Sequence, residues 1–203
     1  MNVIPCHFIL VTKRGPNGKK LKLRACLVAN GQHQEYGMDY KETFAPTSSM
    51  ATIHTVLTMA TCQNWEIHQI DVKSTYLNNT LWDDIYMCPP PGYLKEKDKG
   101  KVLKLLPSLY GLKQAGFEWS KELEKFFLKA GYMRSQVDQA VYYHHTSDEH
   151  TVITVSIDDM AVTSKHLKHI LKFKDQLRAQ FEISDIGELT WILGLKVERN
   201  RGS

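Results

Sequence analysis

The sequence has few cysteines and no long apolar run. Its four cysteines, Cys6, Cys26, Cys62 and Cys88, are widely spaced and form no Cys-x-x-Cys pair. Neither a disulfide framework nor a zinc knuckle is therefore indicated, and reduced thiols are expected. No stretch of eighteen apolar residues occurs, and the first residues lack the charged start and apolar core of a signal peptide. We therefore expect an intracellular protein that is not secreted and has no membrane partner.

A strong excess of one charge is also missing. The formal net charge is +4 at pH 7, which is compatible with a polyanionic partner and equally with a neutral substrate. With 203 residues, of which 42% are hydrophobic, the chain can bury one sizeable core, or a core and a small appended lobe. Composition thus permits a globular enzyme without indicating which one.

Two adjacent aspartates, Asp158 and Asp159, follow a run of β-branched residues at 152–157. A second apolar stretch comes next, so the pattern predicts a β-hairpin with both carboxylates at its tip. Asp71 follows another strand-like segment with apolar residues, at 65–70. If the two strands lie side by side, three carboxylates converge where a pair of magnesium ions could bind and transfer phosphoryl groups. An isolated Asp-Asp pair is also ordinary turn chemistry, and this alternative stays open.

The nine histidines do not favour a metal site. His144, His145 and His150 lie in a polar stretch between two strand-like runs, as expected for a hairpin loop. His166 and His169 lie three residues apart on a predicted helix that is otherwise rich in lysine. A solvated helix face is therefore expected there, in preference to a metal-binding pair.

Hydrophobic periodicity predicts three helices, at about 48–63, 114–129 and 165–181. Thr47 or Ser48 is expected to cap the first helix, and Gly131 to end the second. The third helix is expected to bury Leu167, Ile170, Leu171, Leu177 and Phe181. Its solvated side is expected to carry Lys165, Lys168, Lys172, Lys174 and Arg178.

The opening residues 3–28 predict two strands around a turn at 14–18. The hairpin is basic, so it can clamp a phosphate backbone or an incoming triphosphate. Its lysines can equally protect an edge strand, and the two interpretations are balanced. Further strands are expected at 84–87, 102–106 and 186–197, with a charged loop at 95–101.

A set of motifs occurs in one order along the chain. They are Glu42-Thr43-Phe44-Ala45-Pro46, His68-Gln69-Ile70-Asp71-Val72-Lys73-Ser74-Thr75-Tyr76-Leu77-Asn78, Ile85-Tyr86-Met87, Pro89-Pro90-Pro91-Gly92-Tyr93, Ser108-Leu109-Tyr110-Gly111-Leu112-Lys113-Gln114-Ala115, Ile157-Asp158-Asp159, Asp185-Ile186-Gly187-Glu188-Leu189 and Leu193-Gly194. Together they resemble the reverse transcriptase of copia-type retrotransposons over residues 3 to 199.

The resemblance implies an α+β fold. It would contain a reverse-transcriptase-like palm, a small antiparallel sheet with helices on one face, and a β-rich fingers lobe. Residues 1–65 and 78–110 would be mainly fingers, and residues 66–77 and 111–203 mainly palm. The family's thumb and RNase H regions are not matched, so the chain is expected to be part of a polyprotein.

The resemblance also implies an RNA-directed DNA polymerase, a nucleotidyltransferase with two Mg²⁺ ions per site and Mn²⁺ as a possible substitute. Asp71 and Asp158 would hold the metals, Asp159 would complete the acidic cluster, and Val72 would offer its backbone carbonyl. The implied partners are an RNA template, a DNA primer or RNA–DNA hybrid, deoxynucleoside triphosphates and the remaining polyprotein domains. The implied location is a cytoplasmic virus-like particle or the nucleus.

The resemblance assigns five residues to nucleotide binding. Tyr76 would be an aromatic gate against a 2′-hydroxyl, with a core tyrosine as the alternative. Tyr110 and Gly111 would line the nucleotide pocket, although Gly111 also suits a turn before a helix. Arg24 and Lys73 would contact the triphosphate, and Lys73 could instead lie in solvent.

A primer grip would be formed by Trp191, Leu193 and Gly194. It would be a hairpin that presses the primer end toward the metals, and a buried apolar strand is the alternative.

Departures from the family pattern bear on activity. Cys26, Asn30 and Phe117 stand where the family usually has basic residues. Ser120 stands in place of a usual tyrosine, and Ser156 in place of a usual large side chain. Each lost charge-assisted phosphate contact is worth about 1.5–3 kcal/mol. A non-catalytic nucleic-acid-binding remnant is therefore the alternative function. A palm-type nucleotide cyclase is disfavoured, because no Gly-Gly-Asp-Glu-Phe-like turn occurs.

Overall fold

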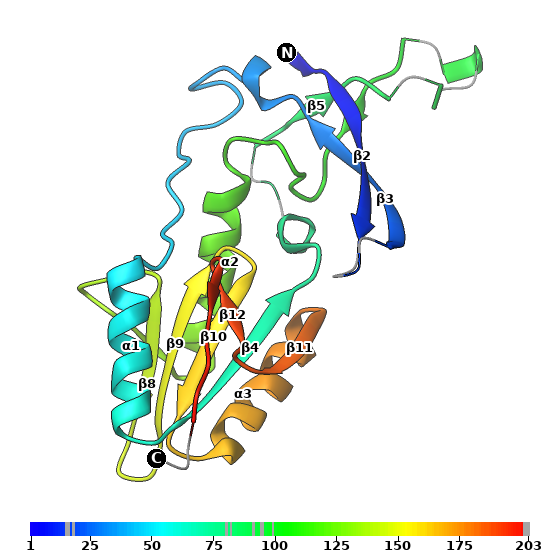
Figure 1. Cartoon of the computed structure of the whole chain (residues 1–203). Helices are drawn as coiled ribbons and strands as arrows, with labels where there is room; N and C mark the ends of the chain where they lie inside the picture. Colours follow the sequence, from blue (N-terminus) through cyan, green and yellow to red (C-terminus); the bar gives the residue numbers. More distant parts are fainter. Residues whose placement is uncertain are drawn as a thin grey trace. The chain divides into compact units, whose positions relative to one another are not determined.

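The computed structural model describes residues 1–14, 17, 19–79, 81, 83–90, 92–93, 96–98 and 100–200. Within them, three α-helices and four β-sheets are found. The chain divides into two compact units (Figure 1). The first comprises Met1–Phe44 with Tyr76–Trp119, and the second Ala45–Thr75 with Ser120–Ser203. Helix α2 (Ala115–Lys129) begins in the first unit and ends in the second.

The first unit is built on short strands and one long hairpin. Strands β2 (Cys6–Arg14) and β3 (Lys20–Ala29) pair antiparallel, as the sequence predicted. A second sheet has the order β1-β5-β6, with β1 (Val3–Ile4) parallel to β5 (Tyr86–Met87) and β5 antiparallel to β6 (Leu103–Lys104). The expected strands at 84–87 and 102–106 are thus present but shorter.

Single-turn segments of 3₁₀-helix lie in the connections between the longer elements. They are η1 (Gly31–His33), η2 (Thr75–Asn78) and η3 (Glu96–Asp98). Parts of two predicted connections, Gly15, Pro16 and Gly18 of the hairpin turn and Lys95 and Lys99 of the charged loop, lie outside the described residues.

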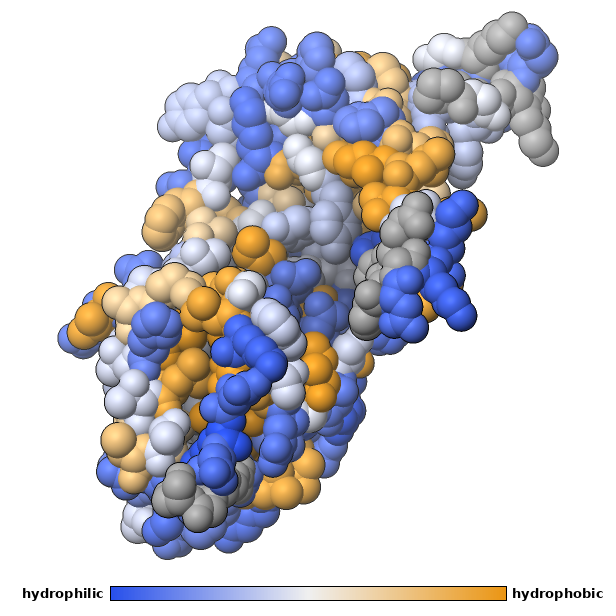
Figure 2. Space-filling view, viewed as in Figure 1, coloured by the Kyte–Doolittle hydropathy of each residue, from blue (hydrophilic) through white to orange (hydrophobic). Residues whose placement is uncertain are grey.

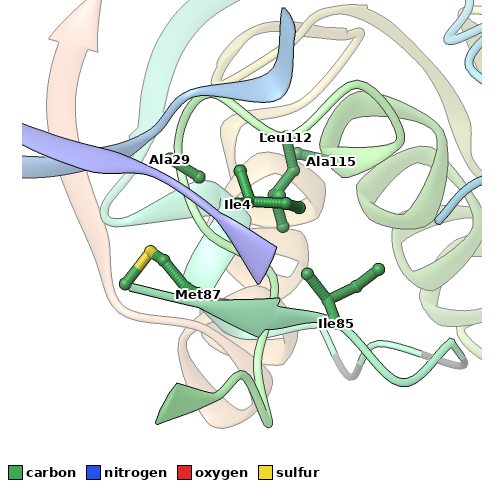
Figure 3. Packing of buried hydrophobic residues seen from close by; sticks show 6 residues of the cluster. All are labelled: Ile4, Ala29, Ile85, Met87, Leu112 and Ala115. Carbon is green, nitrogen blue, oxygen red and sulfur yellow. The ribbon is translucent and has the colours of Figure 1, made fainter. Parts of the chain in front are cut away.

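Apolar residues from separate segments form the core of the first unit (Figure 3). They are Ile4, Ala29, Ile85, Met87, Leu112 and Ala115. The hairpin extends beyond this core and leaves apolar side chains exposed. Leu10 is 78% exposed and Leu23 is 76% exposed. Figure 2 shows apolar side chains gathered over the hairpin on its visible face.

The second unit contains a six-stranded antiparallel sheet of order β11-β4-β10-β9-β8-β7. Its strands are β4 (Glu66–Val72), β7 (Met133–Arg134), β8 (Val141–His145), β9 (His150–Ser156), β10 (Asp159–Ser164) and β11 (Ile183–Glu188). A bulge lies between Asp185 and Gly187 in β11. The central strands β4 and β10 carry buried side chains on both faces, which allows helices to pack on either side.

Helix α1 (Met50–Cys62) covers one face of this sheet, where Ile53 and Ala60 pack with Ile67 and Ala161. Its N-cap is Ser49, whose hydroxyl accepts a hydrogen bond from the Thr52 backbone N–H at 3.1 Å. Our predicted caps, Thr47 and Ser48, were therefore wrong.

Ser48 is instead tied to the sheet. It is buried, and its backbone N–H donates to the Val155 carbonyl at 2.9 Å.

The opposite face of the sheet is covered by α3 (Leu167–Gln180) and the second half of α2. Phe127 of α2 stacks on Tyr142 of β8 at 4.1 Å and on Phe173 of α3 at 5.9 Å between ring centroids. Helices therefore lie on both faces (Figure 1), whereas the resemblance implied one. The apolar residues on both sides of β4, such as Ile67 and Ile70, are the physical reason.

Three of the five side chains that we expected to be buried along α3 are buried, namely Ile170, Leu177 and Phe181, and the other two are not. Leu167 and Leu171 are 42% and 45% exposed, whereas Lys174, expected on the solvated side, is 1% exposed. The Lys174 ammonium donates to Asp185 Oδ1 at 2.5 Å and to His68 Nδ1 at 2.8 Å. These polar partners make burial of the charged lysine possible.

The expected range of the fingers, residues 1–65, is divided by the boundary at Phe44. Residues 45–65 belong to the second unit, because α1 packs against β4 and β10 there. Naming the units fingers and palm stays a prediction. In the described part of the chain, no helix has both the length and the apolar character needed to cross a membrane.

Candidate active site

Two of the three predicted metal-binding carboxylates lie opposite each other in the central sheet. Asp71, near the end of β4, is the register partner of Asp159, the first residue of β10. Directly opposed residues of an antiparallel pair share one face, with Cβ atoms about 4.5–5.5 Å apart. The strands that carry the two acids therefore lie side by side, as the sequence analysis required.

Asp158 occupies the two-residue turn between β9 and β10, after Ile157. Ile157 has φ +60°, and the described residues with positive φ do not include Asp158. Positive φ at the first central residue alone is the pattern of a type II′ turn, where glycine is usual. A β-branched residue in this region is strained, and such strain occurs preferentially at functional sites.

A backbone hydrogen bond fixes this turn to the neighbouring strand. The Val72 backbone N–H donates to the Asp158 carbonyl at 2.9 Å. The Val72 carbonyl, a predicted metal ligand, accepts from the Thr75 hydroxyl at 2.9 Å. A carbonyl oxygen has two lone pairs, so one remains for a further partner. Asp158 and Val72 are thus held at the same end of the sheet as Asp71 and Asp159.

Carboxylate and carbonyl oxygens are suitable ligands for Mg²⁺ or Mn²⁺. Among the residues that the structure describes, however, no three His, Cys, Asp or Glu side chains are grouped closely enough to hold one metal ion. The oxygen donors fit a hard cation, and Asp71 and Asp159 are directly opposed across β4 and β10.

Gln69 is a member of this site that we did not predict. Its side-chain amide donates to Asp159 Oδ1 at 3.2 Å, and the residue is 8% exposed. The available signal was its spacing, since it lies two residues before Asp71 and hence on the same face of a strand.

Four of the five predicted nucleotide-binding residues lie together in the first unit. Arg24, Tyr110 and Gly111 line a pocket of about 400 Å³. The Tyr76 ring meets the Tyr110 ring edge to face, with centroids 4.9 Å apart. The remaining lining residues are Ile9, Val11, Cys26 and Val28.

The backbone at Gly111 approaches β3 closely. The Ala29 N–H donates to the Tyr110 carbonyl at 2.8 Å. Gly111 has φ +92°, and a Cβ atom there would lie 2.1 Å from the Ala29 carbonyl oxygen. Glycine is therefore required at this position to form one wall of the pocket.

Lys73 is the fifth predicted nucleotide-binding residue. It lies in the second unit, where its ammonium pairs with the Glu182 carboxylate at 2.7 Å. Both side chains are well exposed, so the ion pair adds about 0–1 kcal/mol of stability.

The predicted primer-grip residues form a small hairpin of β12 (Trp191–Ile192) and β13 (Leu195–Lys196). Both turn residues have positive φ, +46° at Leu193 and +82° at Gly194, which is the pattern of a type I′ turn. Trp191 is 54% exposed whereas Ile192 is 3% exposed. The alternative of a buried apolar strand therefore applies to Ile192 and not to Trp191.

Comparison with known proteins identifies the family. A family model described as "Reverse transcriptase (RNA-dependent DNA polymerase)" matches residues 1–203. The chain belongs to the reverse transcriptase family.

Among its relatives, the "Retrovirus-related Pol polyprotein from transposon RE1" of Arabidopsis thaliana is 33% identical over 98% of this chain. The "Retrovirus-related Pol polyprotein from transposon TNT 1-94" of Nicotiana tabacum is 34% identical over 98% of this chain. The chain spans 14% and 15% of the length of these two polyproteins. These two relatives are Pol polyproteins of plant copia-like transposons, in agreement with the resemblance.

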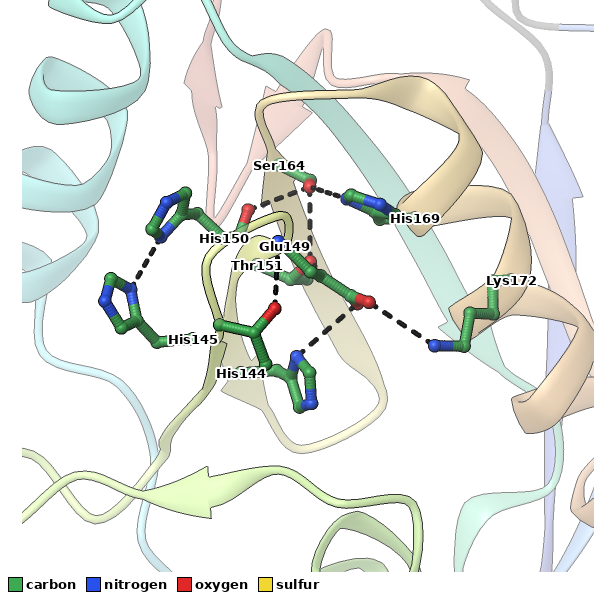
Figure 4. Close-up of polar contacts among 9 residues, drawn as sticks. His144, His145, Glu149, His150, Thr151, Ser164, His169 and Lys172 are labelled. Atoms are coloured by element: carbon green, nitrogen blue, oxygen red, sulfur yellow. Dashed lines mark hydrogen bonds and ion pairs between the residues drawn. The ribbon is translucent and has the colours of Figure 1, made fainter.

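The histidines of the β8–β9 hairpin in this reverse-transcriptase-family domain, His144, His145 and His150, are shown in Figure 4. By the strand register they lie at the end of the sheet away from Asp71. His145 ends β8 and His150 begins β9, so the hairpin loop between them is shorter than we expected. Their Nδ1 atoms are 2.6 Å apart. Glu149 is buried there and pairs with Lys172 at 3.3 Å.

His169 does not lie on the solvated helix face that we predicted. It is 7% exposed, and its Nδ1 is 3.5 Å from the Ser164 hydroxyl. Burial lowers the pKa of His169 below its ordinary value.

Proposed function

We propose that this domain is an RNA-directed DNA polymerase that adds deoxynucleotides to a primer by two-metal phosphoryl transfer. The observation that carries the proposal is the pairing of Asp71 with Asp159 across β4 and β10, beside the strained turn that bears Asp158. Membership of the reverse transcriptase family supports the reaction class.

Asp71, Asp158, Asp159 and the Val72 carbonyl would hold two Mg²⁺ ions, or Mn²⁺ in their place. When bound, the ions would make the primer hydroxyl nucleophilic and neutralise the charge of the departing pyrophosphate. The protein holds the ligands in place: the β4–β10 register and the Val72–Asp158 backbone hydrogen bond fix the backbone that carries them before the cations bind. Ligands held by rigid strands need little reorganisation on binding.

The pocket of the first unit would take the nucleotide. Arg24 would pair with the triphosphate, while Tyr110 and Tyr76 would offer aromatic surface to the sugar and base. Its apolar lining at Ile9 and Val11 suits the uncharged part of the ligand. The primer end would rest on the exposed Trp191, and the template would be an RNA strand.

Primer extension on an RNA template, with Mg²⁺ or Mn²⁺, tests the proposal. Asp158→Asn should abolish incorporation of deoxynucleotides while the circular-dichroism spectrum and melting temperature stay close to those of the unaltered chain. Asp148→Asn is the matched control, because Asp148 is an exposed carboxylate in the loop between β8 and β9. Extension that persists in the Asp158→Asn protein would show that the metal assignment is wrong.

A second candidate function is nucleic-acid binding without catalysis. The absence of a three-ligand group among the described residues favours it, as do Cys26 and Asn30 at positions where basic residues are usual. Binding of an RNA–DNA hybrid that weakens steeply with salt, without extension under either metal, would support this function.

A further inference from the structure

We infer that Gln69 is a positioning residue that orients the Asp159 carboxylate for the metal site. This inference rests on the proposed function. It starts from the hydrogen bond between the Gln69 amide and Asp159 Oδ1, at 3.2 Å.

The register of the sheet explains how the two side chains meet. Asp159 lies opposite Asp71, and Ala161 lies opposite Gln69. All four residues share one face of the β4–β10 pair. Ala161 is the small member of the set, so the Gln69 side chain can extend along the face past its methyl group to Asp159, two residues away.

The position of Gln69 on this face is unusual. Its neighbours on this face, Ile67 two residues earlier in β4 and Ala161 opposite it in β10, belong to the apolar cluster under α1. An apolar residue at position 69 would continue that cluster, yet a glutamine with 8% exposure stands there. A buried amide is costly unless it is hydrogen-bonded, and the bond to Asp159 meets this need.

The bond constrains what Asp159 can do. The amide donor occupies Oδ1 and thereby fixes the rotation of the carboxylate. The second carboxylate oxygen is left to serve as a ligand from a defined direction. Asp159 alone, next to a two-residue turn, would sample several rotamers and would have to be ordered on cation binding.

The first test is direct binding of Mn²⁺, followed by electron paramagnetic resonance of the free ion and requiring no catalysis. Gln69→Met keeps the length of the side chain and removes the donor. We expect it to weaken Mn²⁺ binding about tenfold, the lower end of the range for loss of a group that orients a metal ligand.

Thr163→Val is the matched control. Thr163 is a buried residue on the same face of β10, where its hydroxyl donates to the Val152 carbonyl at 3.1 Å. Its replacement removes a buried donor from the same sheet without touching the carboxylates. Mn²⁺ affinity should stay within about twofold of that of the unaltered chain, because the ligand-orienting bond is retained.

A double-mutant cycle with Asp159→Ala, which removes the acceptor, provides a readout without metal. If Gln69 acts through Asp159, the losses in melting temperature from Gln69→Met and Asp159→Ala are not additive. The tenfold effect of Gln69→Met on Mn²⁺ binding should likewise disappear in the Asp159→Ala background. Additive losses, or a Gln69→Met protein that binds Mn²⁺ as tightly as the unaltered chain, would overturn the inference.

Failure of the proposed function gives a different result. If the unaltered chain binds no Mn²⁺ while the cycle still shows coupling, the bond is purely structural, and both the metal site and the positioning role are wrong. Where the chain extends primers, Gln69→Met should raise the Mg²⁺ concentration for half-maximal rate about tenfold and leave the rate at saturating Mg²⁺ within about twofold.

Discussion

Replacing Ile157 by glycine and by alanine isolates the strain at the turn that carries Asp158. Ile157 has φ +60° and is 46% exposed. Both replacements remove the same part-exposed side chain beyond Cβ. They differ in the backbone, because alanine keeps the steric penalty of positive φ and glycine does not.

The expected difference follows from two opposing terms. Alanine in the left-handed region costs about 1–2 kcal/mol relative to glycine. Glycine loses more conformational freedom on folding, which costs about 0.5–1 kcal/mol relative to alanine. The Ile157→Gly protein should therefore be more stable than Ile157→Ala by about 1 kcal/mol, or about 2–4 °C in melting temperature for a chain of this size.

Urea denaturation of the two variants measures this difference. The matched control is the same pair of substitutions at Val137, which is 99% exposed and is not among the described residues with positive φ. There alanine should equal or exceed glycine in stability. An Ile157→Ala protein as stable as Ile157→Gly would show that the turn at Ile157 is unstrained.

Three further predictions concern the framework of the site. Gly111→Ala should destabilise the chain by more than about 2 kcal/mol and abolish nucleotide binding, measured by thermal melting and calorimetry, because the new methyl group would meet the Ala29 carbonyl. Ser49→Ala should lower stability by about 1 kcal/mol in urea denaturation, because the α1 cap is lost. Burial and the nearby Lys174 lower the pKa of His68 in the folded state, so below about pH 6.5 the unfolded state binds more protons. The stability of the fold should therefore decrease as the pH is lowered below about 6.5. His68→Gln should reduce that slope, which cannot exceed about 1.4 kcal/mol per pH unit for one proton, and an unchanged slope would contradict the assignment.

The sequence was sufficient for features set by local pattern. The helix around Ile53, the helix ended by Gly131 and the hairpin bearing Asp158 were all predicted, because periodicity and turn residues report on the local backbone. The neighbouring placement of Asp71 came from the family motifs and is seen in the β4–β10 register.

Features that depend on partners far along the chain were not predictable in this way. Lys174 was placed on the solvated face because lysine is usually exposed, yet its partners Asp185 and His68 permit its burial. Gln69 was not predicted as part of the site, because its hydrogen-bond partner Asp159 lies 90 residues away in the chain. Ser49 was missed as the cap because three hydroxyl residues, any of which can cap a helix, stand in a row.

In the proposed function, Asp71 and the Asp158–Asp159 hairpin act together on divalent cations to extend a primer. Single-turnover incorporation of one deoxynucleotide on a primed RNA template, compared between the unaltered chain and Asp71→Asn over a range of Mg²⁺ concentrations, tests it most directly. We expect incorporation by the unaltered chain and none by Asp71→Asn at any Mg²⁺ concentration, with the fold retained. Equal incorporation by the two proteins would contradict it.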